Sequence, residues 1–209
     1  MEIDKTLIES VLRNLENRRF EAYYRATAAE ARDLALSLIP SGDTVAWGGS
    51  RTAEQIGLIE AVKERADIKA IDRDKAISPA DRRRLMREGL LADTFIAGVN
   101  AISRDGWLVN IDGTGNRVAA ITFGPENVIL VAGVNKISDG ALQSAVSRAR
   151  NVAAPLNTVR LDLPTPCKET GRCADCMTDN TICCHFSEIR YCKPAGRIKV
   201  VLIGEELGF

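Results

Sequence analysis

Short apolar runs alternate with helical segments along this chain, and that alternation constrains the fold more than any other feature. Each run has the length and apolar character of a buried strand. The predicted strands are residues 44–47, 68–71, 94–97, 107–111, 128–132 and 198–203. Strands separated by helices usually pair in parallel, with the helices packed on the sheet. The sequence therefore predicts an α/β fold, with a mainly parallel sheet and helices on both faces.

Capping residues mark where the predicted helices begin. Capping boxes occur at residues 6–9, 27–30 and 52–55, and the Ser78-Pro79 pair marks a fourth helix start. A further helix is expected from about residue 139 to residue 152, ending before Pro155.

The length of 209 residues suits a single domain that spans residues 1–209. Apolar residues make up 45% of the chain, which is enough for a core without disulfide or metal staples. Within the domain, residues 1–40 are expected to hold the N-terminal helices, and residues 164–193 a cysteine-rich insert.

Charge and hydropathy argue against two classes of partner. Lysine plus arginine and aspartate plus glutamate both number 28, so the chain lacks the basic excess that nucleic-acid binding requires. The longest apolar run, residues 128–134, is far shorter than a membrane span, and the first residues lack a signal-peptide layout. We therefore expect a cytoplasmic protein with no nucleic-acid or membrane partner.

Three polar, glycine-bearing segments follow predicted strands, at residues 48–52, 112–117 and 133–136. Glycines let backbone N–H groups approach a ligand, and a parallel sheet gathers such loops beyond the carboxyl ends of its strands. The predicted ligand-binding residues are Gly48, Gly49, Ser50, Arg51, Thr52, Gly113, Gly115, Asn116, Arg117, Asn135 and Lys136. Their donors favour a small anionic metabolite. The alternative is that these segments are ordinary turns whose glycines serve geometry alone.

Nucleotide cofactors are not expected. The Gly113-Thr114-Gly115 segment lacks the third glycine of a dinucleotide fingerprint, because position 118 is valine. A phosphate-loop Gly-Lys-Ser/Thr sequence is also missing. If the site is catalytic, Asp112 is the expected acid or base.

All six cysteines lie between residues 167 and 192. Local clustering favours metal or redox chemistry over a disulfide framework, and the Cys173–Cys176 spacing lets two thiolates hold one metal. Zinc and an iron–sulfur cluster both fit the residue types. The alternatives are reduced thiols or one local disulfide.

The chain resembles the lactate-utilization (LUD) domain family over essentially its whole length. The matching stretches are residues 20–22, 45–50, 71–74, 110–120, 123–125, 133–136 and 204–209. It is also similar to stand-alone members of this family that carry a Thr-Pro-Cys…Cys-x-x-Cys…Cys insert. Cys167, Cys173, Cys176 and Cys183 fall on that pattern and are the implied metal ligands, whereas Cys184 and Cys192 are extra.

The resemblance implies a fold like that of the sugar-phosphate isomerase and CoA-transferase superfamily. It also implies an accessory role in L-lactate or organic-acid oxidation, beside an iron–sulfur oxidoreductase subunit. A second hypothesis is an isomerase- or transferase-like enzyme acting on a phosphorylated or carboxylated metabolite. Arg51, Arg117 and Lys136 would then hold the anion. A third hypothesis is a metal- or redox-responsive binding protein.

Overall fold

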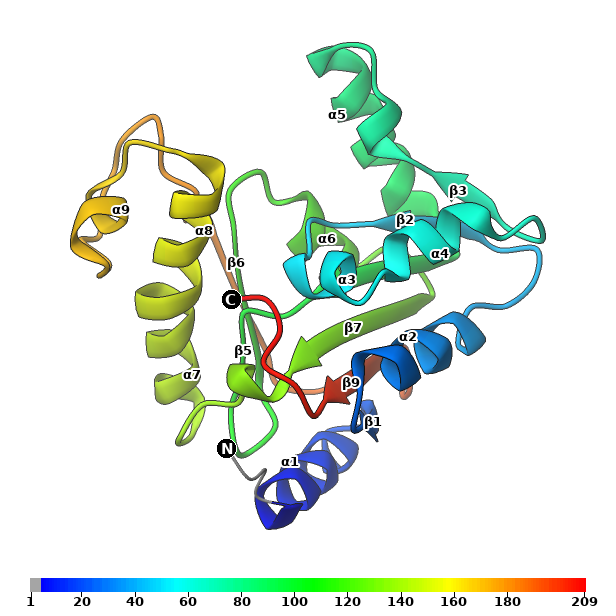
Figure 1. The fold of residues 1–209 in the computed structure, drawn as a ribbon, viewed down its shortest axis with the longest axis horizontal. Helices are drawn as coiled ribbons and strands as arrows, with labels where there is room; N and C mark the ends of the chain where they lie inside the picture. Colours follow the sequence, from blue (N-terminus) through cyan, green and yellow to red (C-terminus); the bar gives the residue numbers. More distant parts are fainter. Residues whose placement is uncertain (1–4) are drawn as a thin grey trace.

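A six-stranded parallel sheet forms the centre of the protein in a computed structural model, which describes residues 5–209 (Figure 1). Its strands lie in the order β1-β9-β7-β4-β2-β3. Their bounds are β1 Glu21–Arg25, β2 Thr44–Trp47, β3 Lys69–Ile71, β4 Thr94–Gly98, β7 Asn127–Gly133 and β9 Ile198–Ile203. All five pairings between neighbours are parallel. The predicted α/β class is confirmed.

Helices cover both faces of this sheet because alternate strand residues point to opposite sides. On β7, Leu130 belongs to one core layer and Val131 to the other. The helices against the first layer are α1 (Lys5–Asn17) and α6 (Asn116–Thr122), and those against the second are α2 (Ala28–Ser37), α3 (Arg51–Gln55) and α4 (Leu58–Glu64). Helix α5 (Pro79–Glu88) has no buried residue and projects from the body (Figure 1).

A second, antiparallel sheet lies beside the first and contains β5 (Ala101–Ile102), β6 (Leu108–Asp112) and β8 (His185–Ile189). Ala101, Val109 and Ile111 from this sheet form a third core cluster with the helical residues Ala145 and Ala149. The strand predicted at residues 107–111 therefore exists, but its expected place in the parallel sheet was wrong. Its apolar residues pack against a separate helix, and a buried run of that kind does not reveal its partner strand.

The last long helical segment differs from the prediction. It begins at α7 (Leu142–Arg148), widens into a π-helical stretch at Ala149–Ala153, and continues as α8 (Ala154–Leu161). The helix was expected to end before Pro155, but the chain stays helical through it. Pro155 stands in the first turn of α8, where a missing N–H is tolerated, and the wider turn precedes it.

Two other helix starts also differ. Ser50, rather than Thr52, caps α3 by accepting the Ala53 N–H at 3.2 Å, and Thr52 is buried inside the helix. Helix α1 already includes Lys5, so Thr6 lies within it. The capping box at residues 27–30 and the Ser78 N-cap are confirmed.

Three strands were not predicted, namely β1, the two-residue β5 and β8. β1 lies between the N-terminal helices, with all five of its residues only half-buried, and β8 lies inside the cysteine-rich insert. The remaining short elements are η1 Arg73–Lys75, η2 Gly89–Leu91, η3 Val134–Lys136 and α9 Pro166–Thr170. None of the helices among residues 5–209 combines the length and apolar character needed to cross a bilayer.

Candidate functional site

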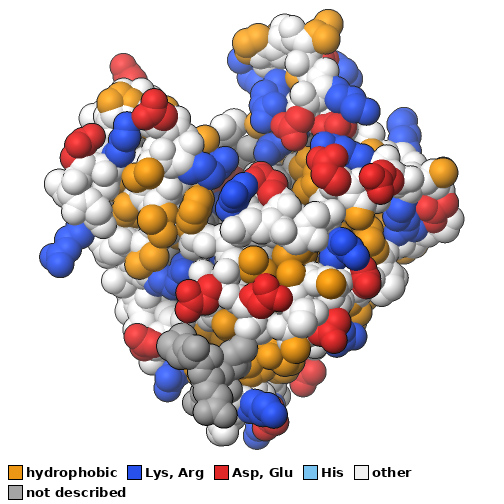
Figure 2. Space-filling model, viewed as in Figure 1, with side chains coloured by type: hydrophobic (Ala, Val, Ile, Leu, Met, Phe, Trp, Pro, Cys, Tyr) orange, Lys and Arg blue, Asp and Glu red, His pale blue; other side chains and the backbone are white. Residues whose placement is uncertain are grey.

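A cavity of about 440 Å³ opens beyond the carboxyl ends of the parallel strands. The segments that follow five of the parallel strands line this cavity. One lining residue from each segment is Ser50 after β2, Arg73 after β3, Asn100 after β4, Lys136 after β7 and Phe209 after β9. Helices α5 and α8 flank the opening, and Figure 2 shows the hollow between the two projecting lobes. Its position is the one at which open α/β sheets bind ligands.

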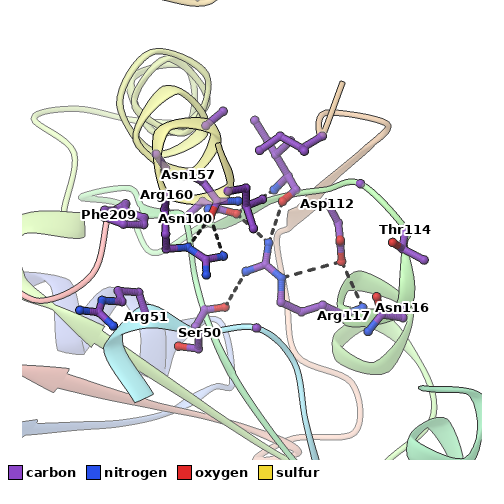
Figure 3. A pocket seen from close by; sticks show the side chains of 18 of the residues that line it. Ser50, Arg51, Asn100, Asp112, Thr114, Asn116, Arg117, Asn157, Arg160 and Phe209 are labelled. Atoms are coloured by element: carbon purple, nitrogen blue, oxygen red, sulfur yellow. Dashed lines mark hydrogen bonds and ion pairs between the residues drawn. The ribbon is translucent and has the colours of Figure 1, made fainter. Parts of the chain in front are cut away.

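The three glycine-bearing segments meet at this cavity. Most of the residues predicted from them line it: Gly49, Ser50, Arg51, Asp112, Gly113, Asn116, Arg117 and Lys136. Figure 3 shows Arg160 and Asn157 of α8 reaching toward the same space as Ser50 and Arg51.

Four of the predicted ligand-binding residues lie elsewhere. Thr52 donates to the Leu207 carbonyl at 3.3 Å, and the Asn135 side chain accepts the Leu207 N–H at 3.1 Å. Gly48 supports the Arg117 side chain, because a Cβ at Gly48 would stand 2.9 Å from the Arg117 Cγ. Gly115 faces a neighbouring hollow. These residues hold the loops and the closing segment in place.

The Arg117 guanidinium is committed to internal contacts. Nη1 donates to the Gly98 carbonyl and the Asn110 side chain, and Nη2 donates to the Asn100 side chain and the Ile111 carbonyl, at 2.7–3.2 Å. Burial lowers the pKa of Arg117, and the nearby Asp112 carboxylate opposes that effect. Arg117 therefore contributes charge to the cavity, while its Nη hydrogens hold the surrounding loops.

Asp112 anchors the start of α6. One oxygen of its carboxylate accepts the backbone N–H groups of Arg117 and Val118, each at 3.1 Å, and lies 3.8 Å from the Arg117 Nε. This arrangement satisfies two of the free N–H groups at the helix N-terminus. The carboxylate lines the cavity in a fixed orientation.

Lys136 is the most unusual residue of the site. Its side chain is only 5% exposed, and it has no hydrogen-bond or ion-pair partner among residues 5–209. Burial, with smaller effects from Arg148 and Arg117, lowers its pKa from the ordinary 10.5 to about 7. A buried lysine without a partner is costly, which is typical of functional rather than structural positions.

Gly98 allows Lys136 and Ser50 to lie close together. A Cβ on Gly98 would stand 2.7 Å from the Ser50 Oγ and 3.7 Å from the Lys136 Nζ. Any side chain at Gly98 would therefore displace the serine hydroxyl, while its Cβ would only be in ordinary contact with the amine. The close approach of these two groups depends on glycine at this position.

Arg73 is a site residue that lies outside the three glycine-bearing segments, so the sequence motifs did not predict it. Its side chain is only 14% exposed, and its Nε is buried without a hydrogen-bond partner among the described residues. Burial lowers its pKa. Residues 71–74 carried part of the family resemblance, and that match was the available signal. Asn100, Asn157, Arg160 and Phe209 also line the cavity. Phe209 lies in the matching stretch 204–209, whereas nothing in the local sequence marks the other three.

The LUD domain model matches residues 8–203, which is nearly the whole chain. The protein belongs to the LUD domain family. The resemblance inferred from the motifs is thereby confirmed, and with it the coarser description of a lactate-utilization-related protein. No curated protein gives a significant match to the sequence.

Three solved structures resemble this LUD domain, and the first of them, with a TM-score above 0.5, supports its fold. A DUF162 family protein from Deinococcus radiodurans aligns over 95% of this chain and 96% of its own, with 13% identity and a TM-score of 0.52. Ribose 5 phosphate isomerase A from Neisseria gonorrhoeae aligns over 58% and 62%, with 15% identity and a TM-score of 0.34. The eIF2B-beta2-delta2 complex from C. thermophilum aligns over 58% and 47%, with 22% identity and a TM-score of 0.38.

The cysteine-rich insert of this LUD domain gathers its thiols near Cys183. Burial raises the pKa of Cys183 to about 11, and the neighbouring Cys173, Cys167, Cys176 and Cys184 raise it further. In the described part of the chain, no three His, Cys, Asp or Glu side chains are arranged to hold a metal ion. Cys192 lies apart, in the main core.

The predicted ligands lie on separate elements of the insert. Cys167 is buried on α9, where its sulfur is 3.3 Å from the Thr165 hydroxyl. Cys173 accepts an N–H from Arg150 at 3.5 Å, and Cys183 packs against the third core cluster. The insert thus rests on the same helical segment that walls the cavity.

Replacing Lys136 with methionine should stabilise the protein at low pH. Because the folded-state pKa is lowered, the unfolded chain binds more protons between pH about 7 and 10.5, and wild-type stability rises with pH there. We expect Lys136→Met to gain roughly 3 to 5 kcal/mol below pH 7, at about 1.36 kcal/mol per pKa unit. The gain should vanish toward pH 10.5.

Denaturant unfolding at several pH values measures this difference. The exposed Lys5 on α1 supplies the control, because Lys5→Met removes a lysine that is not buried and should change stability little. A pH-independent effect of Lys136→Met would contradict the lowered pKa.

Proposed function

We propose that this LUD domain binds a small carboxylate metabolite in its cavity and acts as an accessory component of L-lactate or organic-acid oxidation. The observation that carries the proposal is a set of cations in the cavity that the protein itself does not neutralise. Arg73, Arg160 and Lys136 form this set. These three residues are the uncompensated cations.

Counting charges in the cavity explains why these three are uncompensated. The lining has six basic residues, Arg51, Arg73, Arg82, Arg117, Arg160 and Lys136, and three acidic ones, Glu54, Asp74 and Asp112. Each acid lies within 3.2–3.8 Å of an arginine, namely Arg51, Arg82 and Arg117. Among residues 5–209, Arg73 reaches only Asp74, at 4.0 Å, and neither Arg160 nor Lys136 forms an ion pair.

An anionic ligand would relieve this imbalance. Guanidinium groups donate two parallel hydrogen bonds to a carboxylate, and such bonds are strong where water is partly excluded. Arg160 is held by the Asn157 side chain at 2.9–3.0 Å, which keeps its guanidinium at the cavity wall. The volume of about 440 Å³ is that of a small-metabolite site.

Titration calorimetry with L-lactate and pyruvate tests this binding. We expect Arg73→Gln to weaken binding about 10- to 100-fold, because a hydrogen bond to a charged group contributes roughly 1.5 to 3 kcal/mol. Arg32→Gln is the matched control, since Arg32 lies on α2 and pairs with Asp33 away from the cavity. No heat of binding with either acid, but a signal with a sugar phosphate, would favour the isomerase-like alternative.

The accessory role predicts an effect in the cell as well. Removing the gene from its host should slow growth on L-lactate, and the Arg73→Gln protein should fail to restore it. The tagged wild-type protein should co-purify with an iron–sulfur oxidoreductase subunit. Normal lactate oxidation without the gene, together with purification of the protein alone, would rule out this role.

We also propose that the cysteine-rich insert binds zinc or an iron–sulfur cluster through Cys167, Cys173, Cys176 and Cys183. The crowding of thiols around Cys183 favours this, because closely spaced thiolates repel each other and a bound cation removes the repulsion. The Arg150 N–H to the Cys173 sulfur is an outer contact of the kind that supports thiolate ligands.

Anaerobic purification followed by metal analysis and an absorption spectrum tests the insert. We expect metal in the wild-type protein and its loss in Cys176→Ser. Visible absorption would identify an iron–sulfur cluster, and a colourless zinc-loaded protein a structural site. Cys192→Ala is the control and should keep the metal, since Cys192 belongs to the main core. A metal-free wild-type protein would leave only reduced thiols.

A further inference from the structure

We propose that Lys136 binds a 2-oxo acid covalently, by forming an imine between its side-chain amine and the ligand's carbonyl carbon. This inference rests on the proposed carboxylate site and names its substrate class. A 2-oxo acid such as pyruvate is what oxidation of a 2-hydroxy acid produces. The ligand would combine the carboxylate that the arginines attract with a carbonyl that an amine can attack.

The position of Lys136 suits this chemistry. Its side chain is buried, lines the cavity, and has no internal partner among residues 5–209 that would hold the amine away from a ligand. It belongs to η3, directly after the central strand β7, so its backbone is rigidly placed. A lysine needed only for structure would be expected to pair with a carboxylate or carbonyl oxygen.

The protonation state of Lys136 also suits imine formation. An amine must be neutral to attack a carbonyl, and only about one ordinary lysine in a few thousand is neutral at pH 7. Burial and the charges of Arg148 and Arg117 lower the pKa of Lys136 to about 7, so a large fraction is neutral near neutral pH. Burial and the charges of Arg148 and Arg117 thus activate the amine, whereas Arg73 and Arg160 attract the anion.

The residues around Lys136 would bind different parts of the 2-oxo acid. Arg73 and Arg160 supply permanent positive charge for the ligand's carboxylate. The Ser50 hydroxyl accepts the Ala53 N–H at 3.2 Å and keeps its own hydrogen for donation toward the cavity. Because Gly98 leaves room for both, the hydroxyl and the Lys136 amine face the same space.

The reaction balances without an oxidant or reductant. The Lys136 nitrogen lone pair forms a bond to the carbonyl carbon, and the carbonyl π electrons move to oxygen. A proton transferred from nitrogen to that oxygen gives a carbinolamine. Loss of the hydroxyl group and the remaining nitrogen proton as water then leaves the C=N bond. The step is reversible, because water regenerates the free acid and the amine.

Cyanoborohydride trapping tests the inference on the wild-type protein. Pyruvate and cyanoborohydride should convert Lys136 to a stable secondary amine, which peptide mapping by mass spectrometry locates. L-lactate has a hydroxyl group in place of the ketone carbonyl and should give no label. Labelling should rise with pH and level off above pH about 7, whereas exposed lysines react increasingly up to higher pH.

Two variants sharpen the result. Lys136→Arg keeps a positive charge but offers no amine, so it should lose the label. Lys75→Arg changes an exposed lysine outside the cavity lining and should leave labelling of Lys136 unchanged.

The outcomes separate this inference from the proposed function. Label confined to Lys136 supports both. Pyruvate binding by calorimetry without label overturns the imine and leaves the carboxylate site standing. Label spread equally over exposed lysines also overturns the imine. If neither pyruvate binding nor label is found, both the imine and the carboxylate site are overturned.

Discussion

The guanidinium of Arg117 joins the two sheets, and the shape of the cavity depends on it. It bonds to the Gly98 carbonyl at the end of the parallel sheet and to Asn110 and Ile111 in the antiparallel one. A single buried cation therefore fixes the distance between two separately packed layers. Asp112 offsets part of its charge and, by capping α6, holds the backbone of Arg117 itself. This reciprocal arrangement keeps the cavity open between them.

The rest of the cavity departs from the rule that buried charges are paired. Among the described residues, Lys136 is buried without a partner, and the buried Nε of Arg73 has no hydrogen bond and lies 4.0 Å from the Asp74 carboxylate. This arrangement costs stability that the large apolar core can supply. Unpaired buried charges are concentrated at ligand-binding sites, because a charged group that already has a partner within the protein cannot also bind a ligand strongly. Arg117 illustrates one use of largely buried positive charge in this site, and Arg73 and Lys136 illustrate another.

Sequence patterns predicted the parallel sheet because its central strands are continuous apolar runs, such as residues 128–132. They did not predict β1 and β8, whose half-exposed residues carry no such signal. The gathering of Ser50 and Lys136 followed from topology, since parallel strands end at one edge. Asp112 reaches the same cavity from the end of a strand in the antiparallel sheet, which the pattern did not predict. Arg160 could not be found that way. It reaches the cavity from a helix whose continuation through proline depends on a local π-helical turn.

The strand order has a consequence for how the chain assembles. The first strand, β1, pairs within its sheet only with β9, where Glu21 lies opposite Lys199. During synthesis β1 cannot pair until β9 has emerged, and until then both β1 and the flank of β7 expose unpaired backbone. Contacts so distant in sequence form slowly. The nascent protein is thus open to wrong association until β9 is made.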